Sequence, residues 1–375
     1  VYSSAASDVY KRQCVSCGMC LVNCPFGAIV DKGQIFQLIT AMKKKKKVIA
    51  IVAPAFVGQF GPKASPEKLT AAMKKLGFAD VVEVAIGADL CSIEEAKDFM
   101  REVPEHQPFM ATSCCPAWIK YAENEYPEIL PNISTCRSPM QMFASVINEK
   151  FKGEGKKILS VAVMPCTAKK GEAARDEFKD ENGKPLVDFV ITTQELIMMI
   201  KEAGIVFNEI EPEAVDMPFG TMTGAGVIFG VTGGVTEAVI RRVSTDKSLA
   251  SLRNLAFEGV RGFEGIKELE VPLGDKAIKV CVVNGLRNVE VIMNRMKAGE
   301  HFDLIEVMAC PNGCIGGAGQ PKATIDEKKE RSVNLYNADK LCTLKRSEEN
   351  PLMDKLYEGI LKGREHELLH VSYVK

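Results

Sequence analysis

The sequence lacks the features that mark several common functional classes. No apolar run of about 18 residues or more occurs, so no membrane-spanning helix is predicted, and no secretory or twin-arginine signal is visible. The 48 Lys and Arg residues are offset by 49 Asp and Glu residues, so the net charge of −1 offers no bulk basic surface for nucleic acid. The His residues show no metal-binding spacing and are assigned no site: His106, His301, His366 and His370.

An initiating Met is also absent, and residues 1–13 (VYSSAASDVYKRQ) show no apolar periodicity. We interpret this segment as the edge of a fragment or as a sequence artefact, and we exclude it from the fold prediction. The chain has 375 residues, of which 46% are hydrophobic and 26% charged. This is enough for two or three domains with a sizeable core.

Cysteine, by contrast, is abundant, and most of the 13 cysteines are clustered. One compact run lies near the N-terminus, and three cysteine islands lie at 112–118 (TSCCPAW), 164–170 (MPCTAKK) and 308–321 (MACPNGCIGGAGQP). Thirteen cysteines could indicate disulfides, but such clustering indicates metal binding in a reducing compartment. We therefore expect a cytoplasmic metalloprotein.

The islands supply the four thiolates that one cubane iron–sulfur cluster needs. One comes from each of the first two islands and two from the third: Cys115, Cys166, Cys310 and Cys314. Cys114 is left over, because adjacent residues rarely turn both side chains toward one cubane. A plain electron-transfer cubane would explain the thiols, but not Lys169, Cys114 or the paired Met164 and Met308.

The N-terminal run has the spacing of bacterial ferredoxins. Its members are Cys14, Cys17, Cys20 and Cys24, and Pro25 follows. In two-cluster ferredoxins the first three thiolates hold one 4Fe-4S cluster and the fourth serves the other. Here only one such run is present. One alternative is therefore that all four thiolates hold the same cluster. A second alternative is that they bind zinc as a zinc knuckle. We predict a partial α+β ferredoxin-like domain at 14–40 that transfers electrons.

A run of five lysines, Lys43–Lys47, follows this segment. It is interpreted either as a solvated linker or helix end, or as a docking site for an acidic electron carrier such as ferredoxin.

Strands that alternate with helices predict an α/β architecture. Apolar, β-branched runs are expected to form strands at 48–52, 81–86, 158–164, 189–192, 278–283 and 304–308. Helices are expected at 36–42, 65–76, 93–103, 118–126, 171–179, 193–203, 235–243 and 288–297. Pro54 follows the first strand, at the edge where open α/β sheets place ligands. The charged tail from residue 322 is expected to wrap the surface.

Two glycine-rich stretches are interpreted as places where the backbone approaches a cofactor. Residues 219–234 (FGTMTGAGVIFGVTGG), which include Phe229, fit neither GxGxxG nor a P-loop, so nucleotide binding is not expected. In the third island the N–H groups of four glycines are predicted to form a nest for anionic sulfurs: Gly313, Gly316, Gly317 and Gly319.

Together the islands resemble the signature segments of the di-iron (iron-only) hydrogenases: TSCCPAW, MPCTAKKGE and EVMACPNGCIGGAGQP. Weaker similarity runs through FGTMTGAGVIFGVTGG and SPMQMF to LYNADK, RSEENP and HELLHVSY, so the resemblance covers about residues 48–375. It implies a two-lobed catalytic domain at 48–321, with mostly parallel sheets and the cofactor between the lobes. A C-terminal segment like the hydrogenase small subunit would occupy 322–375.

The resemblance also implies that Cys314 bridges the cubane to a di-iron unit with CO, cyanide and dithiolate ligands. Lys169 would donate a hydrogen bond to cyanide, unless it is a surface lysine. Met164 and Met308 would pack on the cofactor, unless they are ordinary core residues. Cys114 would deliver protons beside the open iron site, since a thiol titrates near pH about 8.5; the alternative is a buried inert thiol.

A proton relay beyond Cys114 is implied by the same resemblance. The acid–x2–acid helix of the family matches Glu95 and Asp98, and its serine matches Ser134. Ordinary solvated helix charges are the alternative, and Glu306 is another candidate acid. Arg101 or Glu102 falls near the position of the expected surface Arg. Several residues depart from the family pattern: Asp98 for Glu, Ala117 for Gly, Met140 for Gln, Thr236 for Met, and Ala318 within the glycine run.

The other cysteines are expected to be core or incidental thiols: Cys91, Cys136, Cys281 and Cys342. The function implied is reversible oxidation of molecular hydrogen, with protons and a ferredoxin-type carrier as partners and maturation proteins that supply the di-iron unit. A hydrogen sensor with low turnover and a non-catalytic iron–sulfur assembly protein remain as alternatives. The latter class keeps the cubane thiols but loses the di-iron pocket.

Overall fold

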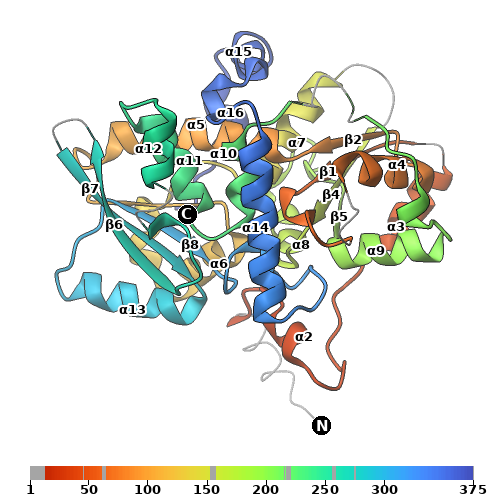
Figure 1. The fold of residues 1–375 in the computed structure, drawn as a ribbon, viewed down its shortest axis with the longest axis horizontal. Helices are drawn as coiled ribbons and strands as arrows, with labels where there is room; N and C mark the ends of the chain where they lie inside the picture. The colour runs from red at the N-terminus through yellow and green to blue at the C-terminus, as the bar shows by residue number, and fades with distance from the viewer. Residues whose placement is uncertain are drawn as a thin grey trace.

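The structure is a computed structural model that describes residues 13–44, 46–60, 65–152, 158–214, 216, 221–255, 259–273 and 276–374. Two four-stranded sheets stand side by side, and helix α14 (Ile325–Leu341) runs across the front between them in Figure 1. Within the described part of the chain, no helix is both long and apolar enough to cross a membrane.

The first sheet is parallel throughout. Its order is β2 (Asp80–Glu83), β1 (Lys47–Val52), β4 (Ile158–Met164) and β5 (Phe189–Thr192). Alternate residues of β1 and β4 pack against three helices, α3 (Ile35–Lys43), α4 (Pro66–Leu76) and α9 (Thr193–Glu202). The residues between them face the opposite side, toward the middle of the molecule. Burial on both faces explains why these strands are continuous apolar runs.

The second sheet has the order β3 (Met110–Ala111), β8 (Leu304–Met308), β7 (Lys276–Asn284) and β6 (Ile266–Leu273). Only β6 among these strands is antiparallel, and it pairs with β7 as a ribbon. Helices α6 (Pro116–Glu125) and α13 (Leu286–Lys297) cover one face, and α11 (Gly234–Val243) packs on the other. The predicted fold class, α/β with mostly parallel sheets, is confirmed.

Helix α5 (Ala85–Glu102) connects the cores of the two sheets. Its first half packs with the first sheet through Ile86 and Leu90, and its second half packs with the second sheet through Phe99. Helix α7 (Pro139–Lys150) crosses it at Gly87, where an added Cβ would lie 2.2 Å from the Pro139 carbonyl oxygen. This fixed helix pair positions the side chains that α5 directs toward the islands.

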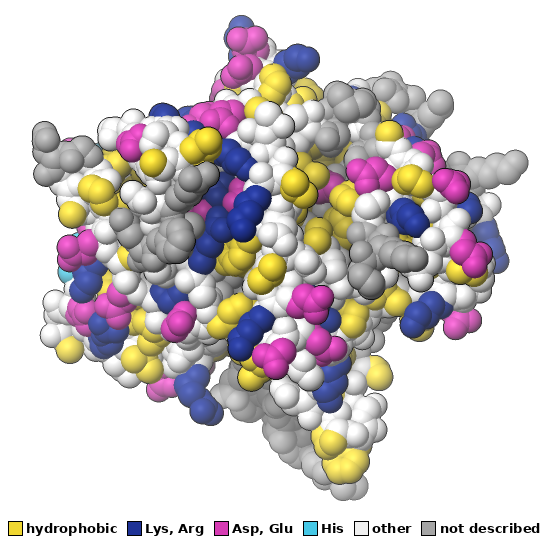
Figure 2. Space-filling view, viewed as in Figure 1, with side chains coloured by type: hydrophobic (Ala, Val, Ile, Leu, Met, Phe, Trp, Pro, Cys, Tyr) yellow, Lys and Arg dark blue, Asp and Glu magenta, His cyan; other side chains and the backbone are white. Residues whose placement is uncertain are grey.

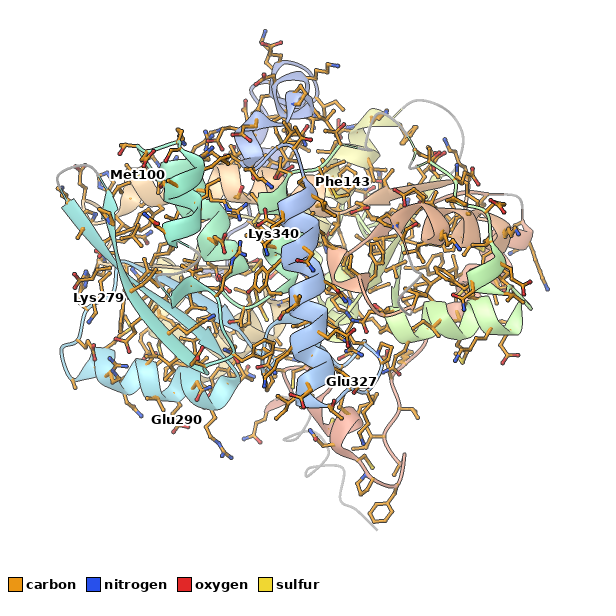
Figure 3. All side chains as sticks on the ribbon, viewed as in Figure 1. Met100, Phe143, Lys279, Glu290, Glu327 and Lys340 are labelled. Atoms are coloured by element: carbon orange, nitrogen blue, oxygen red, sulfur yellow. The ribbon has the colours of Figure 1, made fainter. Side chains whose placement is uncertain are left out.

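The C-terminal tail is more ordered than expected. A capping box of Thr324 and Glu327 starts α14, and Lys340 in its last turn complements the helix dipole; Figure 3 labels Glu327 and Lys340 at these two ends. Helices α15 (Pro351–Glu358) and α16 (Glu365–Leu369) follow.

Several predicted boundaries were wrong. The strand expected at 81–86 ends at Glu83, and α5 begins at Ala85 rather than at residue 93. The apolar run at 84–86 is the buried first turn of this helix, and a short apolar run has no period that separates helix from strand. The helix expected at 171–179 is split into α8 (Ala168–Ala173) and a 3-10 turn.

The N-terminal part projects from the lower side of the molecule in Figure 1. It holds α2 (Met19–Asn23), and its link to the islands includes a hydrogen bond of 2.8 Å from the Thr167 hydroxyl to the Ser16 carbonyl oxygen. Figure 2 shows exposed apolar side chains at this tip, and Phe26 and Val30 are 88% and 83% exposed.

Candidate active site

One cavity gathers the residues that the sequence analysis singled out from distant islands. Its empty volume is about 780 Å³, which includes open solvent at its mouth. The predicted site residues that line it are Pro54, Cys114, Cys115, Met164, Cys166, Lys169, Phe229, Met308, Cys310, Cys314 and Gly317. Residues up to 263 positions apart in sequence, Pro54 and Gly317, therefore converge there, because the islands follow β3, β4 and β8.

The four thiols form a donor set that suits a metal cluster. Burial raises the pKa of Cys166 and Cys314 to about 12, and the neighbouring thiolate of Cys115 adds to the shift. Burial also raises the pKa of Cys310 well above its usual range. Four thiolates that line one cavity repel one another, so the set becomes stable as thiolates when cations lie between them. This chemistry fits iron in a cubane.

The glycines of the third island do not form the predicted nest, and that prediction was wrong. Their N–H groups donate to backbone carbonyls instead, for example Gly317 to Cys314 at 3.0 Å and Gly319 to Pro165 at 2.9 Å. What these glycines provide is close packing, since a Cβ at Gly317 or Gly319 would lie 2.3 or 2.7 Å from Pro165 backbone atoms. The N–H group of Ala309 points to the Cys115 sulfur at 3.5 Å.

Lys169 lies in the wall of the cavity and is tied to two chain segments. Its ammonium donates to the carbonyl oxygen of Cys114 at 3.1 Å and pairs with the Glu172 carboxylate at 2.7 Å. Burial would lower the pKa of Lys169, but Glu172 outweighs burial and leaves the pKa raised. Lys169 is therefore charged and largely buried, and the surface-lysine alternative was wrong. Glu172 was missed, although its i,i+3 spacing from Lys169 signals such a pair.

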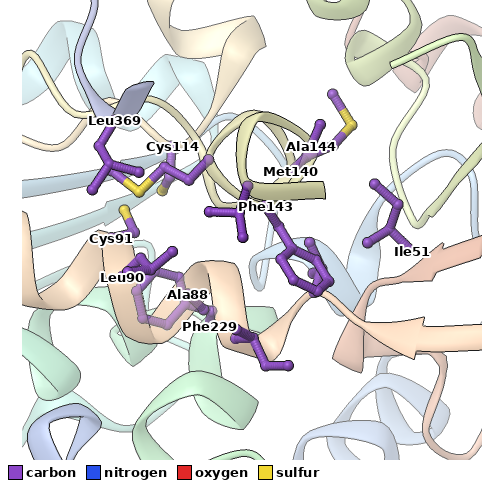
Figure 4. Close-up of a cluster of buried hydrophobic side chains, with 14 of the residues drawn as sticks. Ile51, Ala88, Leu90, Cys91, Cys114, Met140, Phe143, Ala144, Phe229 and Leu369 are labelled. Carbon is purple, nitrogen blue, oxygen red and sulfur yellow. The ribbon is translucent and has the colours of Figure 1, made fainter. Parts of the chain in front are cut away.

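Cys114 is 8% exposed and lines the same cavity. Figure 4 shows Cys91 of α5 pointing toward it. The pKa values of Cys91 and Cys114 are both raised well above the usual range, mainly by burial and next by the charge of Glu95.

The residues of the predicted relay lie together beyond Cys114. Glu95 is fully buried, and the N–H group of Ser113 points to its Oε1 at 3.5 Å. Burial raises the pKa of Glu95 to about 8, while the Ser134 hydroxyl is among its hydrogen-bond partners. Asp98 is 5% exposed and pairs with the exposed Arg101 at 2.7 Å. The alternative of solvated helix charges was wrong for both acids.

Glu306, the other candidate acid, has a different position. Both of its carboxylate oxygens accept backbone N–H groups at 2.7 Å, from Gly233 and Thr236. It therefore anchors the first turn of α11.

The four cysteines of the N-terminal run do not all line one cavity. Cys14, Cys17 and Cys20 line a second cavity, and Cys24 is not among its lining residues. Backbone N–H groups of residues 26–29 lower the pKa of the half-buried Cys24, with that of Ala28 first. Cys17 also packs at the cluster of small residues that borders Cys115.

Two remaining motifs are only partly described. Of the five lysines, Lys45 lies outside the described residues, and Lys47 pairs with Asp80 at 2.8 Å. Of the stretch 219–234, residues 219 and 220 lie outside the described residues. Cys281 is core, in β7.

His370, to which the sequence assigned no site, lies 3.5 Å from Asp98 and 3.2 Å from Glu94. More than 270 positions separate His370 from these acids, so no local spacing could have revealed the contact.

Comparisons with known proteins agree with this geometry. The family model described as iron only hydrogenase large subunit, C-terminal domain, matches residues 46–318, and the iron hydrogenase small subunit model matches residues 325–375. The NADP-reducing hydrogenase subunit HndD of Solidesulfovibrio fructosivorans is 39% identical over 96% of this chain and 66% of its own length. Iron hydrogenase 1 of Clostridium pasteurianum is 37% identical over 94% of this chain and 65% of its own.

A solved FeFe-hydrogenase structure matches with a TM-score of 0.78, at 32% identity, over 91% of this chain and 99% of that chain. The apo FeFe-hydrogenase HydA1 from Chlamydomonas reinhardtii matches with a TM-score of 0.76 at 32% identity, over the same shares. More distant relatives include the cytosolic iron-sulfur assembly component 3 of Bos taurus, 29% identical over 96% of this chain and 82% of its own length. The extent of the family match and of the structural match shows that the chain belongs to the iron-only hydrogenase family.

Proposed function

We propose that this protein is an iron-only hydrogenase that interconverts molecular hydrogen with protons and electrons. The observation that carries the proposal is the single cavity in which four cluster-type thiols meet Cys114, Lys169, Met164 and Met308. Iron-only hydrogenases are also among the relatives, although the chain covers only about two thirds of their length.

In this proposal the four thiols hold a cubane, and Cys314 joins it to a di-iron unit. The di-iron unit, when bound, supplies the open iron position at which hydrogen is formed or split. Lys169 would orient it through a hydrogen bond to a cyanide ligand, because its charged ammonium is largely buried in the cavity wall. Met164, Met308 and Phe229 would exclude water from it.

Protons would move from Cys114 through Glu95 and Ser134 to Asp98 and Arg101. A carboxyl group with a pKa of about 8 is mostly protonated near neutral pH, and it gives up its proton without a large driving force. Electrons would pass from the cubane to the 4Fe-4S cluster of Cys14, Cys17 and Cys20, and then to a ferredoxin-type carrier. Maturation proteins that deliver the di-iron unit and a cytoplasmic location belong to the same proposal.

The second candidate is an iron–sulfur assembly protein, which the more distant relatives favour. A pocket that holds only a cubane would not need a buried ammonium, a thiol that is not a cluster ligand, or a pair of methionines. All of these line the cavity here. A hydrogen sensor with low turnover would share the pocket and differ only in rate.

Infrared spectroscopy tests the proposal. The chain would be produced without oxygen together with the maturation enzymes, and bands of iron-bound CO and cyanide are expected. Hydrogen turnover would then separate the enzyme from the sensor. A folded chain that holds its cubane but shows no such bands would contradict the proposal and favour the assembly protein.

A further inference from the structure

Asp98, Cys136 and His370 place three different metal-ligand atoms around one point. The Cys136 sulfur lies 3.9 Å and His370 Nδ1 lies 3.5 Å from the same oxygen, Oδ2 of Asp98. All three ligand atoms are within 4.8 Å of one another, and all three residues are buried. Ligands about 2.0 to 2.3 Å from a tetrahedral zinc ion stand roughly 3.2 to 3.8 Å apart, so the observed spacing needs little adjustment.

Backbone pairing holds two of these ligands in register. Cys136 and His370 are partners in an antiparallel bridge, so their side chains leave the pair on the same side, toward α5. Two backbone hydrogen bonds of 2.7 Å flank the bridge, from Arg137 to Leu369 and from Val371 to Thr135. The donor set is thus held by helix α5 and by two chain segments that a β-bridge joins.

The second contact of the histidine ring prepares it to bind a metal ion. Its Nε2 lies 3.2 Å from the Glu94 carboxylate. The same carboxylate accepts from the Lys97 ammonium at 2.7 Å, so it acts as an acceptor and Nε2 of His370 carries the hydrogen. Nδ1 is then directed at Asp98 and at the Thr135 hydroxyl, which lies 2.9 Å away. A carboxylate behind a histidine is the usual outer partner of zinc-binding imidazoles.

Charge and access also suit a divalent ion. An aspartate, a thiolate and a neutral imidazole with Zn²⁺ give a complex of zero net charge, which lowers the cost of burial. Glu94 is separately balanced by Lys97 at 2.7 Å. Thr135 is exposed next to the cluster, so the site is one side chain from solvent and its fourth position opens toward that hydroxyl.

We propose that Asp98, Cys136 and His370 form a binding site for Zn²⁺ at the solvent end of the relay. Binding replaces the thiol proton of Cys136, which leaves to water, and displaces the Thr135 hydroxyl from His370 Nδ1. One sulfur, one nitrogen and one oxygen ligand are a set typical of zinc. The metal would occupy Oδ2 of Asp98 and thereby close the exit of the proton route. Closure of this exit rests on the proposed hydrogenase function, whereas the binding of zinc does not.

The binding test uses the full chain with its iron–sulfur clusters assembled, incubated with zinc alone and then desalted. We expect one zinc per chain by elemental analysis. X-ray absorption at the zinc edge should show one sulfur at about 2.3 Å and nitrogen or oxygen ligands at about 2.0 to 2.2 Å. In a chelator competition, Cys136→Ser and His370→Asn should each weaken zinc binding at least tenfold.

His301→Asn is the matched control, since His301 pairs with Asp303 at 3.0 Å on the surface and has no third ligand near it among the described residues. It should leave zinc binding unchanged. Asp98→Asn keeps the shape of the side chain, and it serves as a third variant in case Cys136→Ser or His370→Asn folds poorly. It should weaken zinc binding as those two variants do. The proposed site would be overturned if Cys136→Ser bound zinc as tightly as the unchanged chain does. It would also be overturned if X-ray absorption showed three or four sulfur ligands around the zinc.

A turnover assay tests separately whether bound zinc closes the exit of the proton route. Hydrogen turnover of the unchanged chain should fall when zinc is added and return when a chelator removes it, and Cys136→Ser should lose this response. Zinc that binds at the site without changing turnover would overturn the closure of the exit but not the site. A chain that shows no turnover at all would contradict the proposed function and leave the binding result standing.

Discussion

Lys169 joins two parts of the site through one ammonium group. It holds the Cys114 carbonyl oxygen and neutralises Glu172, whose side chain is only 3% exposed. Breaking a buried ion pair leaves an uncompensated charge, which costs about 3 to 5 kcal/mol. The pair therefore keeps Cys114 in place and makes the cavity wall stable.

Lys169→Met should accordingly lower the free energy of unfolding by about 3 kcal/mol, because Glu172 loses its partner. The double variant with Glu172→Gln should recover more than half of this loss, since no buried charge remains. Denaturant unfolding of the three chains measures both effects. Lys179→Met is the control, because Lys179 pairs with an exposed Asp176 and should change stability by less than about 1 kcal/mol. A double variant no more stable than the single one would contradict the role of charge.

Glu95 makes stability depend on pH. Its pKa is raised from 4.5 to about 8 by burial, so the folded state keeps a proton that the unfolded chain loses from pH 4.5 upward. The folded state consequently loses stability as the pH rises through this window, by about 1.4 kcal/mol per pH unit at most. This cost is absent below about pH 4.5 and fully present above about pH 8.

Glu95→Gln removes the ionisable group but keeps the shape of the side chain. Its thermal midpoint, relative to that of the unchanged chain, should rise as the pH is raised from 5 to 8. The experiment is a set of melting curves at several pH values, with Glu105→Gln as the control in a turn before the first island. A difference that stays constant with pH would mean that Glu95 is not protonated in the folded state.

At the scale of elements, the crossing of α5 and α7 sets the positions of Glu95 and Asp98. Gly87→Ala would place a Cβ 2.2 Å from the Pro139 carbonyl oxygen, a backbone atom, so the two helices would have to move apart. We expect a loss of about 1 to 3 kcal/mol in unfolding free energy. Gly171→Ala in α8 meets no atom within 4 Å and should instead stabilise the chain by about 0.5 to 1 kcal/mol. Equal effects at the two glycines would contradict the close crossing.

The elements that could be predicted are those whose signal is local. Strands β1 and β4 are continuous apolar runs, and the helix expected at 193–203 shows its capping box in the sequence. The bounds predicted for these three elements were therefore close to those observed. Helix α7 and strand β6 were missed: α7 is buried on much of its surface, and the alternation of β6 is a weak signal over eight residues. The start of α5 was wrong because its first turn is entirely apolar.

The site divides in the same way. The thiols, Lys169 and the two methionines belong to compact motifs, so the sequence was enough to select them, and the strand ends explain why they converge. Glu172 and His370 depend on contacts that only the fold creates. The glycine nest was a wrong prediction because N–H groups in a tight turn first satisfy neighbouring carbonyls.

At the scale of the whole molecule, hydrogen bonds, an ion pair and close packing hold the N-terminal part to the rest of the described chain. Lys170 is central among them: it pairs with Asp31 and donates to both oxygens of Glu195 at 3.0 and 2.9 Å. Close packing adds to this at Gly18, whose φ is +74° and where a Cβ would lie 2.4 Å from that of Ala318. Cys17 packs at the same cluster of small residues as Cys115, so these contacts control the distance between the two cysteines.

Lys170→Met should therefore loosen residues 14–34 while the sheets keep their stability. A charged hydrogen bond is worth about 1.5 kcal/mol, which corresponds to roughly tenfold faster amide exchange through local opening in this segment. Hydrogen exchange read by mass spectrometry measures this, with Lys184→Met, which breaks a more exposed pair with Asp188, as the control. Helix α9 should remain protected, because Glu195 still caps it through the Thr192 N–H group at 2.6 Å. Exchange that rises equally in α9, or not at all in 14–34, would show that Lys170 does not fasten the N-terminal part to the rest of the chain.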